Sequence, residues 1–109
     1  MRFRGRIAIL NVLKHCGKEK NLWKVRRLHA ELISQNLIGN DGSIATAFVT
    51  TYAKCGAMEE ACEIFEKIPV RNVVSWSALI SGYTQNGLGR EALRCFEQMR
   101  KDNICADAI

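Results

Sequence analysis

Two stretches of this chain repeat each other. The segment "TYAKCGAMEEACEIFEKI" at residues 51–68 aligns without a gap on "GYTQNGLGREALRCFEQM" at residues 82–99, at an offset of 31. The six identical pairs are Tyr52/Tyr83, Gly56/Gly87, Glu60/Glu91, Ala61/Ala92, Phe65/Phe96 and Glu66/Glu97. A unit this short cannot bury an apolar face alone, so the repetition indicates that the copies stack on one another.

The apolar residues inside each copy have the spacing of an α-helix. Trp76, Leu79, Ile80 and Tyr83 lie at i, i+3, i+4 and i+7, and a second apolar stripe follows the "NGLG" segment at 86–89. We expect Gly87 to end the first of these helices in the left-handed conformation. No segment alternates apolar and polar residues over the length of a strand, so the sequence predicts an all-α fold.

A third, weaker copy lies upstream at an offset of 36 and contains Leu13, Cys16, Val25, Leu28 and Leu32 at the matching apolar positions. The chain then divides into helix–turn–helix units at 6–41, 42–72 and 73–107, and 108–109 would begin a further unit. We predict an α-solenoid of three stacked hairpins, an α–α superhelix. Both terminal units have apolar stripes, so we expect the chain to be part of a longer solenoid.

The charge of the chain is concentrated near its N-terminus. The formal net charge is +5, and residues 1–41 carry nine Lys/Arg against three Asp/Glu. This bias suits a polyanionic partner, although a solvated helix face explains it equally well. No apolar run reaches the length of about 18 residues that a membrane helix needs, and we expect any targeting segment to lie upstream of this chain.

The cysteines do not form a recognisable metal or disulfide pattern. Their number is five, which is odd, and none lies in a Cys-x-x-Cys pair. His15, Cys16 and His29 match no spacing typical of a zinc site. We therefore expect free thiols, most of them buried, no metal site and no cofactor.

The segment "NVVSWSALISGYTQNGLGREALRCFEQMRKDNICAD" at 72–107 closely resembles the pentatricopeptide repeat, which is found in a plant-expanded family of organellar RNA-binding proteins. "IATAFVTTYAKCGAMEEACEIFEKIPVRN" resembles the short variant of this repeat and "ILNVLKHCGKEKNLWKVRRLHAELISQN" the long variant. The order of a long (6–41), a short (42–72) and a standard repeat (73–107) resembles the PLS subfamily, which is linked to RNA editing. Ala106 departs from the pattern, since proline is usual before the aspartate.

The resemblance implies which residues would read RNA, one base per repeat. In this family a residue of the first helix and the last residue of the repeat contact the same base. These pairs would be Thr46 with Asn72, with a preference for adenine, and Ser77 with Asp107, with a preference for guanine. Aspartate only accepts hydrogen bonds, whereas asparagine donates and accepts. The first unit would have Leu10 and Asp41, and to this pair we assign no base.

The same resemblance implies that apolar residues of neighbouring repeats clamp each base. Ser43 and Val74 would flank the adenine site, with Ser43 as the weaker wall, and Val74 and Ile109 would flank the guanine site. From the residues alone, without the resemblance, Thr46 and Ser77 would be interpreted as exposed polar residues of a helix. Asn72 and Asp107 could cap the following helices, a role compatible with base reading.

Other side chains have simpler interpretations. We expect the aromatic residues of the stripes to be core residues rather than platforms for bases: Phe65, Trp76, Tyr83 and Phe96. Four basic residues are candidates for phosphate contacts: Lys14, Lys24, Arg26 and Arg27.

No catalytic residue is expected. Editing members of the subfamily have a zinc deaminase domain with His-x-Glu and Cys-x-x-Cys elements. "HAE" at 29–31 fits the first element, but no Cys-x-x-Cys follows it, and it would lie inside a repeat helix.

The resemblance thus implies a sequence-specific module that binds single-stranded organellar RNA, part of an RNA-editing or RNA-processing factor of the mitochondrion or chloroplast. Further partners would be editing-factor proteins or a deaminase acting in trans. No association with a membrane is expected. The alternative is a helical scaffold for protein–protein interaction without nucleotide recognition.

Overall fold

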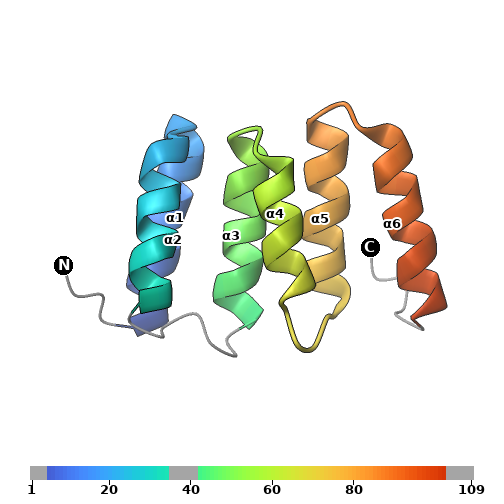
Figure 1. The fold of residues 1–109 in the computed structure, drawn as a ribbon, viewed down its shortest axis with the longest axis horizontal. Coiled ribbons are helices and arrows are strands. Elements are labelled where there is room, and N and C mark those ends of the chain that lie inside the picture. The colour runs from blue at the N-terminus through green and yellow to red at the C-terminus, as the bar shows by residue number, and fades with distance from the viewer. Residues whose placement is uncertain (1–4, 35–41, 103–109) are drawn as a thin grey trace.

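The computed structural model describes residues 5–34 and 42–102, and within these ranges the chain forms α-helices and no strand. The helices are α1 (Gly5–Glu19), α2 (Leu22–Ser34), α3 (Gly42–Lys54), α4 (Met58–Glu66), α5 (Val73–Gln85) and α6 (Gly89–Lys101). They run up and down in sequence order across the molecule (Figure 1). The prediction of an all-α fold is confirmed.

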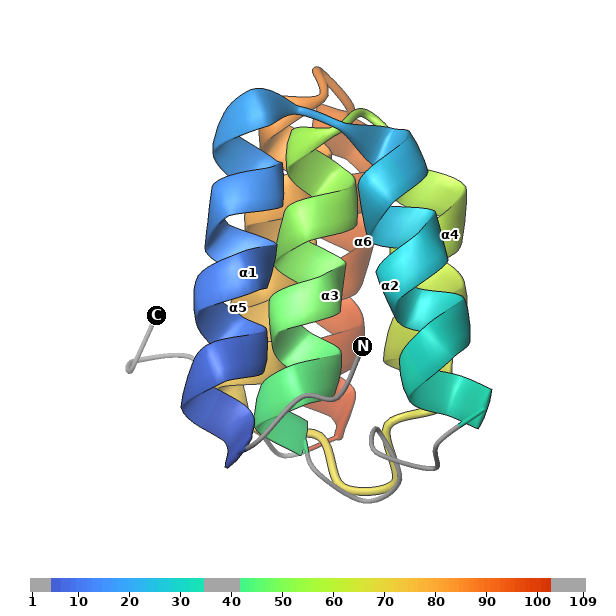
Figure 2. The same ribbon diagram turned by 90° about the vertical axis from the view of Figure 1, so that its left-hand side faces the viewer.

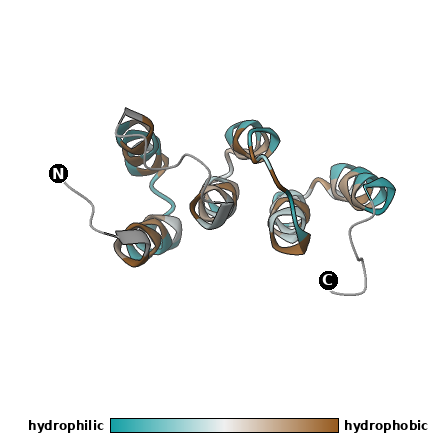
Figure 3. Ribbon diagram, turned by 90° about the horizontal axis from the view of Figure 1, so that it is seen from below, coloured by the Kyte–Doolittle hydropathy of each residue, from teal (hydrophilic) through white to brown (hydrophobic). Residues whose placement is uncertain are grey.

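The helices are arranged as stacked hairpins in two layers. The first layer contains α1, α3 and α5, and α2 and α4 belong to the second (Figure 2). Helix α6 packs against α5 as the second helix of the last hairpin. Helix α3 packs against both α1 and α5, and α4 packs against α3 and α5. Seen from below, each hairpin is turned relative to the one before it, which gives the row a superhelical twist (Figure 3). The predicted α-solenoid is therefore present.

One apolar core continues through the described hairpins. It includes Leu13 of α1, Val25 of α2, Phe48 of α3 and Met99 of α6, all at most 1% exposed. Because each helix contributes its stripe to a core shared with the next hairpin, removing one hairpin would expose its neighbour.

The aromatic residues of the stripes lie where the periodicity predicts them. Phe65 and Trp76 are buried, and their rings meet edge to face with 4.8 Å between the centroids. Tyr83 and Phe96 are half-buried and pack against the core. The expectation of core residues is confirmed for Phe65 and Trp76, whereas Tyr83 and Phe96 lie at the edge of the core.

The turn inside each hairpin uses a residue in the left-handed conformation. Gly56 has φ +79° and Gly87 has φ +73°, so the prediction for Gly87 is confirmed. In the first hairpin the corresponding residue is Lys20, with φ +53°. A side chain at such a position costs about 1–2 kcal/mol. The turn of the first hairpin is therefore more strained than the two turns that have glycine.

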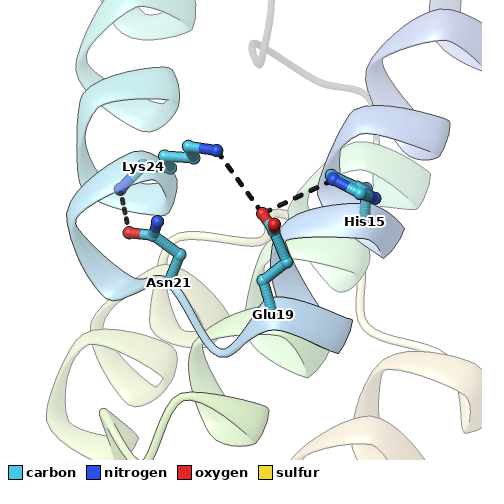
Figure 4. Close-up of polar contacts among 4 residues, drawn as sticks. All are labelled: His15, Glu19, Asn21 and Lys24. Atoms are coloured by element: carbon cyan, nitrogen blue, oxygen red, sulfur yellow. Dashed lines mark hydrogen bonds and ion pairs between the residues drawn. The ribbon is translucent and has the colours of Figure 1, made fainter.

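Polar contacts support this first turn. The Asn21 side chain accepts a hydrogen bond from the backbone amide of Lys24 at 3.2 Å, as an N-cap of α2 does. Figure 4 shows Glu19 between His15, at 3.5 Å, and the Lys24 ammonium, at 3.4 Å. These exposed contacts contribute little to stability but orient side chains at the end of α1.

Side-chain contacts also join neighbouring hairpins. Arg26 of α2 donates from Nε and Nη2 to the two carboxylate oxygens of Glu60 on α4, at 2.9 and 2.5 Å. Behind this pair, the Tyr52 hydroxyl of α3 lies 3.1 Å from Nδ1 of His29 on α2. The first two hairpins are therefore connected by directional contacts as well as by the core.

Helices α3 and α5 approach closely at Gly82. A Cβ at this position would lie 2.8 Å from the Cβ of Ala53 and 3.2 Å from the sulfur of Met58. The absence of a side chain at position 82 thus sets the spacing of two first-layer helices. Within the described residues, no helix has the length and hydropathy that crossing a membrane requires.

Candidate nucleic-acid interface

A shallow hollow lies on the first layer between α3 and α5. Its volume is about 290 Å³. It is lined by Thr46, Thr50 and Ala53 from α3 and by Val74, Ser77, Ala78, Ser81, Gly82 and Gln85 from α5. The lining contains no charged residue and combines hydroxyl groups from both helices with apolar side chains, so it can form hydrogen bonds without selecting for charge.

Thr46 and Ser77, the residues expected to read bases from the first helices of two units, meet in this hollow. Both are half-buried, and no described residue forms a hydrogen bond with either hydroxyl. By contrast, the hydroxyls of Thr51 and Thr84 donate to carbonyl groups one turn earlier in their own helices, at 2.8 and 3.0 Å. The Thr46 and Ser77 hydroxyls are therefore available to a ligand.

The residues expected to clamp a base have different positions. Val74 lines the hollow and is 64% exposed, which is unusual for a valine and leaves an apolar surface beside Ser77. Ser43 is exposed at the start of α3 and does not line the hollow. Of the two walls expected around the first site, the structure brings only Val74 next to both Thr46 and Ser77.

Asn72 does not line the hollow, although it lies only two residues before Val74, which does. It is exposed and is the N-cap of α5, where its side-chain oxygen accepts a hydrogen bond from the backbone amide of Ser75 at 3.0 Å. The capping role considered for this residue is therefore present. Its amide nitrogen forms no hydrogen bond with a described residue.

Three of the residues considered as readers or clamps lie outside the described residues: Asp41, Asp107 and Ile109. Leu10, the first-unit counterpart of Thr46, is half-buried on α1.

Three of the four basic candidates for phosphate contacts lie on the second layer. Lys24, Arg26 and Arg27 belong to α2, whereas the hollow lies between first-layer helices. Lys24 pairs with Glu19 and Arg26 with Glu60, and the Arg27 guanidinium lies 5.3 Å from the centre of the Trp23 ring. Residue type and charge alone do not show whether a basic residue lies on the first or on the second layer. Lys14 remains a candidate, because it is exposed on α1 at the position corresponding to Thr50.

Sequence reasoning overlooked three polar residues of the hollow: Thr50, Ser81 and Gln85. Thr50 and Ser81 each lie four residues after an expected reader, Thr46 and Ser77, and thus on the same face of the helix one turn later. The offset of 31 also relates Thr50 to Ser81. This repeat signal could have identified them.

All four described cysteines are free, but Cys16 alone among them is buried, and Cys55, Cys62 and Cys95 are half-buried. The expectation that most thiols are buried is therefore wrong for the described part of the chain. Among the described residues, no three His, Cys, Asp or Glu side chains are arranged to hold a metal ion. Burial lowers the pKa of His29, whose ring packs 5.0 Å from that of Phe48. Burial also raises the pKa of the Cys95 thiol to about 11. A thiol with a raised pKa is a poor nucleophile.

The sequence of the hairpins matches a known family model. The PPR repeat model matches residues 44–73 and 74–104, which are two adjacent copies that together cover more than half of the chain. The chain belongs to the pentatricopeptide repeat family. The matched copies comprise α3–α4 and α5–α6, the hairpins on either side of the hollow.

Pentatricopeptide repeat proteins of Arabidopsis thaliana resemble almost the whole chain. A mitochondrial member is 40% identical over 109 residues, which cover 99% of this chain and 18% of the relative. A chloroplastic member is 36% identical over 102 residues, 94% of this chain and 12% of the relative. Another is 37% identical over 103 residues, 94% of this chain and 16% of the relative. The chain thus spans less than a fifth of the length of these relatives.

Pentatricopeptide repeat proteins are generally organellar RNA-binding proteins rather than enzymes. The hollow between α3 and α5, with hydroxyl groups from both helices, suits the binding of RNA, because each repeat presents side chains at a regular interval.

Proposed function

We propose that this chain is a sequence-specific module for single-stranded RNA that reads one base per repeat. It would form part of an RNA-editing or RNA-processing factor of the mitochondrion or chloroplast, with editing-factor proteins or a deaminase in trans as further partners. The observation that carries the proposal is that Thr46, Val74 and Ser77 line one hollow. A row of long, short and standard repeats at 6–41, 42–72 and 73–107 is part of the same proposal.

The chemistry of the hollow supports base reading. A hydroxyl group can donate one hydrogen bond and can also accept hydrogen bonds. The Ser77 hydroxyl lies beside the exposed apolar surface of Val74, against which a base can pack. In the proposed arrangement Thr46 and Asn72 bind adenine, and Ser77 and Asp107 bind guanine. Val74 lies between the two bases, with Ser43 and Ile109 on their outer sides.

An exchange at position 72 tests base reading. The substitution Asn72→Asp retains an oxygen that can cap α5 and changes the remaining polar atom from a donor to an acceptor. The preference of this unit should change from adenine to guanine in an anisotropy titration with short RNAs that differ at one base. Asn11→Asp introduces the same charge at an exposed position of α1 and should lower all affinities without changing the preference. An unchanged preference in Asn72→Asp would contradict the proposal.

The salt dependence of binding distinguishes RNA recognition from a protein-interaction scaffold. Binding to RNA phosphates weakens steeply as the salt concentration rises, because counterions are released. We therefore expect the affinity of the wild-type chain for its preferred RNA to fall between low and physiological salt. Binding that is insensitive to both salt and base identity would favour the scaffold.

A further inference from the structure

Hydroxyl groups of α3 and α5 form different contacts inside and outside the hollow. Those of Thr51, Ser75 and Thr84, which do not line it, each donate to a nearby backbone carbonyl, at 2.8, 2.9 and 3.0 Å. A hydroxyl without such a partner keeps its donor and its acceptors for solvent or for a ligand. No described residue forms a hydrogen bond with any of the four hydroxyls that line the hollow, which belong to Thr46, Thr50, Ser77 and Ser81.

The four hydroxyls of the hollow form two pairs. Thr46 and Ser77 make up the first pair, and Thr50 and Ser81, each four residues later on the same helix, make up the second. Four residues advance an α-helix by about 6 Å, so the second pair is displaced from the first by this distance along α3 and α5. The proposed function uses the first pair to read bases and gives no role to the second.

The surroundings of the two pairs differ. Beside the first pair lies Val74, which is 64% exposed and is the one apolar residue larger than alanine in the described lining. At the second pair the helices are close together, since Ser81 precedes Gly82, where a Cβ would lie 2.8 Å from the Cβ of Ala53. A base needs an apolar surface to pack against, so it fits beside the first pair. The narrow end with the second pair suits a smaller polar group.

We propose that Thr50 and Ser81 bind the ribose 2′-hydroxyl of the nucleotide whose base Thr46 reads, and thereby select RNA against DNA. The inference rests on the proposed function, because it concerns the same nucleotide. A base that is read through its Watson–Crick edge carries its sugar on the other side of the ring. A group that binds the sugar must therefore be displaced from the group that reads the base, as the second pair is.

The chemistry of the second pair matches a sugar hydroxyl. The 2′-hydroxyl both donates and accepts, and so does each serine or threonine hydroxyl. One member of the pair can therefore accept from the 2′-hydroxyl while the other donates to it. The described lining holds no charged residue that would favour a phosphate in its place. Lys14, which corresponds to Thr50 on α1, carries its charge at the end of a long flexible stem and reaches further, so it stays a candidate for phosphate.

The test measures how strongly the 109-residue chain distinguishes ribose from deoxyribose at one nucleotide. The preferred RNA is compared, by anisotropy titration, with the same strand carrying a single 2′-deoxy sugar at the adenine nucleotide. The variant with both Thr50→Val and Ser81→Ala removes the second pair and leaves Thr46 and Ser77 in place. Thr84→Val is the matched control, because it deletes a hydroxyl of α5 that bonds to its own helix and does not line the hollow.

We expect the ribose-to-deoxyribose affinity ratio to fall about fivefold in the double variant, the factor that one hydrogen bond typically contributes. Thr84→Val should retain the wild-type ratio. A ratio is used because a loss of stability in a variant, or a change in the free strand caused by the deoxy sugar, cancels in the comparison. The preference for adenine over guanine should survive in the double variant, since the first pair is intact.

The possible failures are distinguishable. A ribose-to-deoxyribose ratio that is unchanged in the double variant overturns this inference and leaves base reading untouched. A loss of base preference together with the ratio would show that Thr50 and Ser81 act on the base, and would also overturn it. A wild-type chain that does not discriminate among bases overturns the proposed function and the inference with it.

A second measurement uses wild-type protein and does not depend on the folding of a variant. Single 2′-deoxy sugars are introduced in turn at each position of the preferred RNA. The largest loss of affinity should occur at the nucleotide that lies between α3 and α5. Equal losses at every position would show that deoxyribose acts through the conformation of the strand, and would overturn the inference.

Discussion

Gly82 of α5 lies so close to Ala53 of α3 that a Cβ at position 82 would be 2.8 Å from the Ala53 Cβ. Both residues line the hollow that contains Thr46 and Ser77. The width of the candidate interface is therefore set by a backbone position without a side chain. This relationship connects the stability of the fold to the geometry of the site.

The substitution Gly82→Ala should force α3 and α5 apart. We expect a net loss of about 1–2 kcal/mol in the free energy of unfolding, because overpacking outweighs the better helix propensity of alanine. Urea denaturation measures the change. Gly89→Ala is the control, since a Cβ at position 89 meets no atom within 4 Å and should be neutral or stabilising. Equal effects of the two substitutions would contradict the role of Gly82.

The substitution Lys20→Gly should stabilise the first hairpin. Lys20 has φ +53°, and glycine adopts this conformation without the cost of a side chain. The greater freedom of glycine in the unfolded chain offsets part of this benefit, so we expect the free energy of unfolding to rise by about 0.5–1 kcal/mol. A rise in melting temperature measures this gain. The same exchange at Lys18, which lies in helical conformation in α1, should destabilise the protein. A destabilising effect at position 20 would refute the prediction.

The ion pair between Arg26 and Glu60 should join the first two hairpins. Hydrogen bonds from Arg26 lower the pKa of Glu60, so the charged carboxylate is the form that the fold stabilises. We expect Glu60→Gln to lower stability more than Glu59→Gln does. Both carboxylates lie in the first turn of α4, and Glu59→Gln thus controls for the helix dipole.

The excess effect of Glu60→Gln should disappear in an Arg26→Gln background and should shrink at high salt, because the pair is partly exposed. Both effects are measured by thermal denaturation of Glu60→Gln and Glu59→Gln, each with Arg26 present and in the Arg26→Gln background. If Glu60→Gln still lowered stability more than Glu59→Gln in the absence of Arg26, the difference would come from some other contact of Glu60.

The stability of the chain should fall as the pH decreases from about 7 to about 5. Burial lowers the pKa of His29 below its ordinary value of 6.5, and repulsion from Lys67 acts in the same direction, while Glu60 and Glu63 oppose it. In this pH range the unfolded chain therefore binds more protons than the folded chain, and stability rises with pH. The contribution of neutral His29 to stability is complete above the pKa of this histidine in the unfolded chain. It is lost as the pH falls through the lower pKa of His29 in the folded chain.

The substitution His29→Gln should flatten this pH dependence, and His15→Gln, at an exposed position of α1, serves as the control. Urea denaturation at several pH values gives the slopes. An unaltered slope in His29→Gln would show that other groups produce the pH dependence.

Periodicity and repetition were sufficient to predict the helices, because each depends on residues close in sequence. The stripe from Trp76 to Tyr83 lies in α5, and Gly87 has the expected positive φ in the turn after this helix. The same register placed Thr46 and Ser77 at matching positions of their hairpins. The charge pattern was less informative, since Lys24, Arg26 and Arg27 proved to lie on the second layer.

The sequence by itself determined that this chain forms amphipathic helical hairpins and which residues recur in each copy, since local spacing decides which side chains share a helix face. Only the tertiary structure decided that hydroxyls from α3 and α5 meet in one hollow, that Gly82 sets its width, and that the Asn72 oxygen is held by Ser75. Distances between helices and the orientation of an amide depend on packing and on hydrogen-bond partners, and neither is encoded in the periodicity of a single helix.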